Sequence, residues 1–183
     1  MQEYLVTLLS GLVTTLELTL FSLLLGIALA ALMTWVLELR LPVATQLVQL
    51  WVLIFTGTPL LIQIFLIYYG PGQFEWLKAS PLWPLLKQPW FCAVLALGFN
   101  TAAYSTRLFK GALDAIPAGE VEACRALGFS AGQTLWMKTR HAARRLVPAY
   151  SNEVILVLKG SSLASTITIM DIMGLAQRLN AQT

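Results

Sequence analysis

The chain has 183 residues, of which 57% are hydrophobic and only 11% are charged, and its formal net charge is +3. Soluble domains carry about 25% charged residues, so this composition excludes an ordinary soluble domain and indicates a chain that lies in a bilayer. The length allows one domain with room for about four or five spanning helices. Outside the central segment no basic patch of the kind that nucleic-acid binding requires is present, so nucleic acid is not an expected partner.

Three hydrophobic stretches predict membrane-spanning helices. The first covers residues 12–37, and a helix of that length reaches about 39 Å, enough to cross an apolar core of about 30 Å with tilt. The second covers residues 43–69 and contains no charged residue, but the Gly-Thr-Pro sequence at 57–59 must kink or break it. The third covers residues 90–108.

A fourth predicted span, residues 149–169, is more polar because Asn152, Glu153 and Lys159 interrupt it. Polar groups at membrane depth must face protein or water, so we expect an interior helix of the bundle followed by a short second helix. Lys159 has two interpretations, a functional charge inside the membrane or a side chain that pairs with Glu153 or reaches the surface. Asp171 and Glu153 are expected near opposite faces of the membrane, which argues against a catalytic pair.

The connection between the second and third spans carries Trp76, Trp83 and Trp90. Amphipathic aromatic rings settle at the headgroup level of a bilayer, which is one interpretation of these tryptophans. An irregular loop with its own small core is the other.

Lysine and arginine predict the orientation of the chain. Residues 107–145 hold seven of the twelve, whereas residues 1–39 hold none. Because basic loops stay in the cytoplasm, we expect the N-terminus outside the cell membrane and the central segment, residues 111–147, inside. Three crossings before this segment agree with that orientation.

The central segment predicts two helices joined by a tight turn. Pro117 ends the preceding helix, Ala118 and Gly119 form a turn, and a short helix runs to Leu127 with Glu120 and Glu122 expected in its first turn, where the helix dipole favours acids. Gly128 is placed to end this helix in the left-handed conformation. Residues 130–133 then fit a capping box that opens the next helix.

The short helix combines small residues with one larger side chain, a pattern that allows a groove of another protein to close around the helix. Ala123 and Ala126 are small, and Leu127 is the larger anchor. The alternative is a helix that lies on the membrane surface with arginines toward lipid phosphates. The residues alone leave both open.

The sequence EACRALG at 122–128 resembles the Glu-Ala-Ala motif of ABC importer permeases, the cytoplasmic loop that docks on the ATPase subunit. The motif's glutamate, two small residues and glycine fall on Glu122, Ala123, Cys124 and Gly128, with Leu127 as the anchor beside them. Cysteine replaces the second alanine but stays small. Residues 55–74 are similar to the second-helix signature of polar-amino-acid permeases of the histidine, arginine and glutamine type, most closely the M-type permeases of arginine uptake. Residues 100–113 and 148–167 are similar to the segments that flank the docking loop, so the resemblance covers nearly the whole chain.

The resemblance implies an all-α, polytopic membrane protein with the helical bundle of a type I (MetI-like) importer permease. It implies a complex with a second permease subunit, identical or homologous, two copies of an ATPase and an extracytoplasmic amino-acid-binding protein, in the inner membrane of a bacterium and in contact with lipid. The chain has no Gly-x-x-x-x-Gly-Lys-[Ser/Thr] loop, so no cofactor is expected on it, and ATP and Mg are expected on the partner ATPase.

Three departures from the family pattern qualify the resemblance. Members usually continue past the equivalent of Thr183 into one more spanning helix, so a bundle without its last helix is expected, and a truncated, non-transporting remnant is the alternative function. Lys138, Thr139 and Arg140 stand where members carry an apolar residue followed by Leu-Pro. Arg107 stands where many carry a glutamate, which leaves open whether this subunit contacts the charged end of a substrate. An integral membrane enzyme is a remote third class, because no catalytic constellation of His, Asp or Cys is present.

The predicted substrate path runs past five residues in the spans: Thr58, Pro59, Gln63, Asn100 and Tyr104. Four of them are polar groups, each of which costs several kcal/mol in hydrocarbon when unpaired, and Pro59 frees a backbone carbonyl that can line a cavity. The alternative is that these groups bond to one another and hold helices together.

Overall fold

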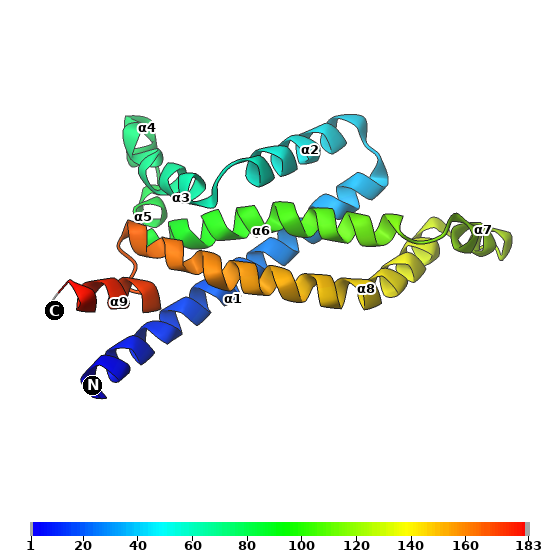
Figure 1. Ribbon diagram of the computed structural model, residues 1–183. Coiled ribbons are helices and arrows are strands. Elements are labelled where there is room, and N and C mark those ends of the chain that lie inside the picture. The colour runs from blue at the N-terminus through cyan, green and yellow to red at the C-terminus, as the bar shows by residue number, and fades with distance from the viewer. Residues whose placement is uncertain (1, 182–183) are drawn as a thin grey trace.

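The structure is a computed structural model that describes residues 2–181, with side chains described from Val6 onward. Every element in this part of the chain is helical, as predicted. Long helices run lengthwise through the molecule (Figure 1): α1 (Gln2–Leu39), α2 (Pro42–Gly57), α6 (Pro89–Asp114) and α8 (Ala131–Gly160). Helix α3 (Leu60–Tyr69) follows α2 after a sharp bend. Short helices form the connections and the C-terminal end: η1 (Pro71–Gln73), α4 (Glu75–Lys78), α5 (Trp83–Leu86), α7 (Ala118–Ala126), η2 (Ser161–Ile167) and α9 (Ile172–Asn180).

Helix α6 is the central helix and contacts α1, α2, α3 and α8. Its approach to α1 is close because small residues face the partner helix. A Cβ atom on Gly98 would lie 2.6 Å from Cδ2 of Leu25, and one on Gly26 would overlap Thr101. Small residues at such interfaces let two backbones approach, which is how helices gain packing energy in a bilayer.

Within the described residues, α1 is the one helix long and apolar enough, by length and composition, to cross a membrane, and the qualifying stretch is Val6–Leu39. Up to three such spans result if each of two bent helix pairs, Pro42–Gln73 and Ala131–Asn180, counts as one. Helix α6, which contains the predicted third span, is not among them. Its second half is polar, and Thr101, Ser105 and Thr106 are buried against neighbouring helices. A central helix can carry such residues because protein rather than lipid covers them.

The predicted break in the second span is present. Helix α2 ends at Gly57, Thr58 and Pro59 are extended, and α3 leaves at an angle of 108° to α2. The N–H of Thr58 still bonds to the carbonyl of Ile54 at 3.1 Å, but proline cannot supply the next bond. The break therefore leaves the carbonyl of Phe55 without a backbone donor inside the bundle.

One continuous helix joins the predicted docking segment, residues 111–147, to the predicted fourth span, residues 149–169. Helix α8 runs without interruption from Ala131 to Gly160 with Pro148 inside it, and Figure 1 shows it changing direction along its length. Proline removes one helical hydrogen bond and bends a helix, but α8 continues because bonds hold it on each side of Pro148: Lys138 pairs with Glu38 of α1, and Glu153 accepts from Thr101 of α6. The chain then passes through η2 to α9, which α1 contacts near Gly11.

Candidate functional site

Three of the predicted path residues, Thr58, Gln63 and Asn100, meet at the break between α2 and α3. The carbonyl of Phe55 has lost its helical donor because Pro59 has no N–H. The side-chain amides of Gln63 and Asn100 donate to this carbonyl at 2.9 and 3.1 Å. Gln63 also donates to the carbonyl and the hydroxyl of Thr58, and Asn100 donates to Oε1 of Gln63 at 3.0 Å. These groups bond the broken span to α6.

The five predicted path residues differ in accessibility. Gln63 is only 5% exposed, and its amide is fully engaged in the hydrogen bonds at the break. Asn100 is half-buried, whereas Thr58, Pro59 and Tyr104 are exposed. The hydrogen bonds agree with the alternative that Gln63 holds helices together. The other positions remain accessible to a molecule that passes the break.

A cavity of about 220 Å³ lies beside the break, between α3, α6 and α8. Its polar lining comes from Asn100, Tyr104 and Glu153, and the remaining lining is aliphatic: Leu60, Leu97, Leu156 and Val157. Two of the predicted path residues thus share a cavity with a carboxylate.

Glu153 is the residue of this site that the sequence did not place there. Its side chain is buried and accepts a hydrogen bond from the hydroxyl of Thr101 on α6. Of the interpretations left open for Lys159, pairing with Glu153 is absent among the described residues, and the Lys159 side chain is exposed. Asp171 is apart from Glu153, and its Oδ1 caps α9 by accepting from the N–H of Gly174 at 2.8 Å. A carboxylate within a predicted span was the available signal for Glu153.

Arg107 lies away from this cavity. It is seven residues beyond Asn100 on α6, which is about 10 Å along the helix axis. Its side chain is exposed and lines a different cavity, of about 560 Å³, whose wall also includes Lys110. Arg107 therefore does not line the cavity that contains Asn100, Tyr104 and Glu153.

The turn after α7 has the predicted form. Gly128 has φ +77°, its N–H bonds to the carbonyl of Arg125, and the N–H of Phe129 bonds to the carbonyl of Cys124, both at 3.0 Å. This pair of bonds is a Schellman motif, which needs a left-handed residue at the glycine position. The predicted capping box follows, with Ser130 and Gln133 bonded reciprocally at the start of α8.

Two local predictions about α7 are wrong. The helix begins at Ala118, capped by Pro117, so the turn precedes the proline and includes Ala115. Glu120 consequently lies in the first turn, and Glu122 lies beyond it. Proline favours the start of a helix because its fixed φ suits the helical backbone and its missing N–H needs no partner there.

The predicted docking residues divide into exposed and buried groups. Glu122, Ala123, Leu127 and Gly128 are exposed, with Leu127 at 75%. Cys124 is 8% exposed and faces the protein, so it cannot contribute directly to a surface for another molecule. Figure 1 shows α7 at one extremity of the molecule, beyond the ends of α1 and α6.

Ion pairs fix the base of the docking segment to the bundle. Glu38 at the end of α1 accepts from Lys110 of α6 at 3.0 Å and from Lys138 of α8 at 2.7 Å. Burial lowers the pKa of Lys110, but its hydrogen bonds to Asp114 and Glu38 outweigh this effect and hold the pKa above its ordinary value. Lys138, one of the departures from the family pattern, thus joins α8 to α1.

The chain matches the family described as "Binding-protein-dependent transport system inner membrane component" over residues 22–180, and it belongs to this family. It is therefore a permease subunit of a membrane transporter and not an enzyme.

Curated relatives are similar over almost the whole chain. The arginine ABC transporter permease protein ArtM of Haemophilus influenzae is 54% identical over 97% of this chain and 78% of its own length. ArtM of Escherichia coli K12 is 52% identical over 100% of this chain and 83% of its own. The octopine transport system permease protein OccM of Rhizobium meliloti is 43% identical over 99% of this chain and 74% of its own.

A solved structure, described as the crystal structure of an amino acid ABC transporter with histidines, has the same fold. Its TM-score is 0.87 at 26% identity, and the match covers 99% of this chain and 81% of that chain. The predicted permease fold is confirmed.

Proposed function

We propose that this permease subunit imports arginine or a closely related cationic amino acid. The observation that carries the substrate assignment is the buried carboxylate of Glu153 in the cavity shared with Asn100 and Tyr104. A buried carboxylate without a cationic partner favours a cation that enters beside it. The identity of 54% and 52% to two arginine permeases supports the same substrate class.

The translocation path passes the break between α2 and α3. Thr58, Pro59, Asn100 and Tyr104 offer exposed or half-buried groups there, and Gln63 holds the break in shape. Carbonyls and amides at a broken helix can bind a substrate at membrane depth because they line a cavity rather than lipid.

The subunit works within a complex. The exposed side of α7, with Glu122, Ala123 and Leu127, docks on an ATPase dimer that binds ATP and Mg, and a second permease completes the path. An extracytoplasmic binding protein delivers the substrate from the side on which the N-terminus lies.

The test is uptake by the assembled transporter in vesicles. Co-reconstitution with the partner permease, the ATPase and the binding protein should give ATP-dependent uptake of labelled arginine. Glu153→Gln keeps the hydrogen-bond acceptor for Thr101 but removes the charge, so we expect arginine uptake at low substrate concentration to fall about tenfold or more at unchanged protein level. An unchanged substrate dependence would contradict the role of the carboxylate.

Glu17 offers a matched control, since it is a second carboxylate in a predicted span that lines none of the cavities described above. Glu17→Gln should leave the concentration dependence of uptake unchanged. Uptake of neutral amino acids in preference to arginine by the unmodified complex would overturn the substrate assignment.

A further inference from the structure

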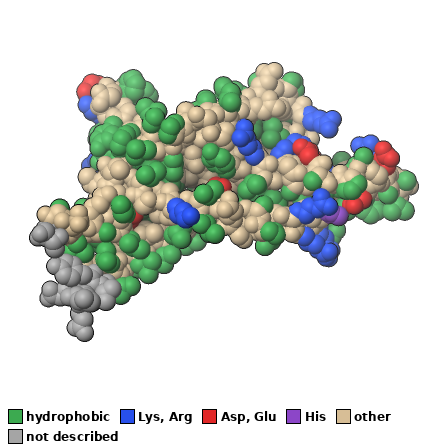
Figure 2. All heavy atoms as spheres, viewed as in Figure 1, with side chains coloured by type: hydrophobic (Ala, Val, Ile, Leu, Met, Phe, Trp, Pro, Cys, Tyr) green, Lys and Arg blue, Asp and Glu red, His purple; other side chains and the backbone are tan. Residues whose placement is uncertain are grey.

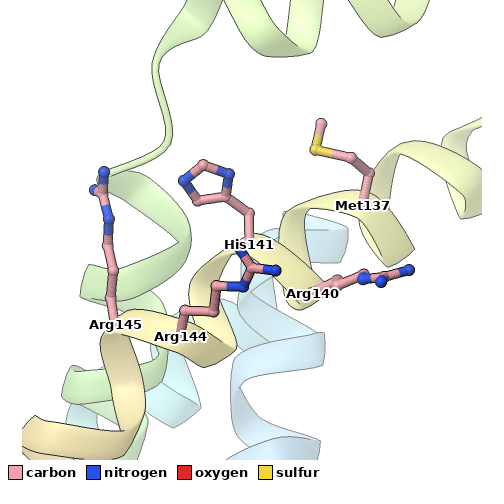
Figure 3. A pocket seen from close by; sticks show the side chains of 5 residues that line it. All are labelled: Met137, Arg140, His141, Arg144 and Arg145. Atoms are coloured by element: carbon pink, nitrogen blue, oxygen red, sulfur yellow. The ribbon is translucent and has the colours of Figure 1, made fainter.

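A basic cavity lies on α8 within the predicted docking segment, residues 111–147, just before the predicted fourth span. Its volume is about 400 Å³, and its lining residues all come from one stretch of α8 (Figure 3): Met137, Arg140, His141, Arg144 and Arg145. Figure 2 shows that Lys and Arg side chains gather at this end of the molecule. The cavity therefore concentrates positive charge within three turns of one helix.

The partners of these side chains leave most of this charge uncompensated. Glu120 Oε2 lies 3.3 Å from Nδ1 of His141, and Arg145 donates to the carbonyl of Ala115 at 3.0 Å. Arg140 and Arg144 are exposed and take part in no ion pair within the described part of the chain. Two guanidinium groups at (i, i+4) spacing are thus free to bind an anion.

The cavity lies at the depth of lipid headgroups if the fourth span begins near residue 149. Arg144 and Arg140 precede that residue by about 8 and 14 Å along the helix axis. The headgroup layer on each side of a bilayer is about 5–8 Å thick, and arginine side chains extend several ångströms further along their stems.

An aromatic side chain supports the same depth. The guanidinium carbon of Arg140 lies 5.5 Å from the ring centroid of Trp136, which is 64% exposed. An exposed tryptophan beside arginines is typical of the membrane–water interface. Met137 adds an apolar wall to the cavity.

We propose that this cavity binds the phosphate of an anionic phospholipid headgroup in the leaflet that faces the docking segment. Arginine forks bind phosphate oxygens in pairs, and basic pockets beside spanning helices on the cytoplasmic side suit acidic headgroups. The proposed orientation of the chain, with the N-terminus outside the cell membrane, decides only in which leaflet this lipid lies. Occupation would fix α8 at the base of the segment that carries α7.

Native mass spectrometry of the full chain in mixed micelles tests the proposal. Micelles contain equal amounts of phosphatidylglycerol and phosphatidylcholine, and the readout is the ratio of the two bound lipids. We expect the unmodified chain to prefer phosphatidylglycerol and Arg140→Gln with Arg144→Gln to reduce this preference about tenfold, toward equal binding. Lys87→Gln with Arg178→Gln removes two exposed charges elsewhere and should keep the preference.

Further measurements test whether the bound anion is a lipid headgroup, a free phosphate or a group on a partner protein. Arg140→Lys with Arg144→Lys keeps the charge but not the forked pair of donors, so this variant should keep part of the preference for phosphatidylglycerol. It also keeps the test valid if the glutamine variant folds poorly. Displacement of phosphatidylglycerol by millimolar inorganic phosphate would assign the site to a free anion and overturn the lipid proposal. Equal binding of both lipids by the unmodified chain would also overturn it. So would loss of ATPase co-purification in the glutamine variant with an unchanged lipid ratio, because the arginines would then contact protein.

Discussion

Gly128 is the residue at which backbone geometry and the proposed docking function coincide. Its φ of +77° closes α7, and an added Cβ would meet no atom within 4 Å. The constraint at this position is therefore conformational rather than steric. Left-handed backbone costs a side-chain-bearing residue about 1–2 kcal/mol, and asparagine tolerates it better than most residues.

Gly128→Asp should reduce the co-purification of the ATPase and uptake together, at unchanged insertion into the membrane. The strained turn would displace Leu127, and the carboxylate would add charge to the docking surface. Measurement of bound ATPase per permease after affinity purification checks this. Gly128→Asn isolates the conformational part and should have a milder effect, and Gly132→Asp places the same charge in the open first turn of α8. Normal co-purification of Gly128→Asp would mean that α7 is not the docking helix.

At the scale of elements, the break between α2 and α3 depends on side chains from two helices. Pro59 removes the donor of the Phe55 carbonyl, and Gln63 and Asn100 replace it. A buried carbonyl that loses its partner costs about 1–3 kcal/mol. The polar side chains of α3 and α6 thus stabilise the bend, because the apolar side chains around it cannot donate a hydrogen bond to the Phe55 carbonyl.

Gln63→Ala should lower the thermal unfolding midpoint of the purified protein by several degrees, because the Phe55 carbonyl and the Thr58 hydroxyl both lose a donor. Thermal unfolding in detergent, together with the concentration dependence of uptake, separates the two roles of this residue. Gln88→Ala, at an exposed position where the side chain makes no cap bond, is the matched control. A changed substrate dependence at unchanged stability would instead place Gln63 in contact with the substrate.

At the scale of the whole molecule, the distribution of charge and the direction of the helices agree. Basic side chains gather at the end that carries α7 (Figure 2), whereas the N-terminus of α1, η2 and α9 lie toward the other end (Figure 1). Loops rich in lysine and arginine remain in the cytoplasm. The arrangement supports an external N-terminus and a cytoplasmic α7.

Cysteines at Ser10 and Gly132 should react with a membrane-impermeant thiol reagent from opposite sides, Gly132 from the cytoplasm. Gly132 is preferable to Ser130, whose hydroxyl caps α8. The native Cys92 and Cys124 are buried, so the unmodified chain should show little background labelling in intact cells and in inverted vesicles. Labelling of both positions from one side would contradict the orientation.

Local signals in the sequence predicted much of the site. Gly128, the Ser130 capping box and the break at Pro59 follow from the backbone preferences of glycine, serine and proline, which act over a few residues. The role of Glu153 did not follow, because Thr101 lies 52 positions away. Local sequence patterns do not show which side chains so far apart in the chain come into contact.

The sequence by itself determined that the protein is helical, lies in a membrane and has a basic central segment, because composition, hydrophobic length and charge asymmetry act independently of how helices pack. Only the tertiary structure decided which polar groups face one another. In the folded chain Glu153 lines a cavity, whereas Lys159 on the same helix is exposed, and α8 extends past Pro148 without a break. The physical reason is that the packing of α6 against α1 and α8 sets the environment of each polar side chain, and that environment decides whether a group is paired, buried or exposed.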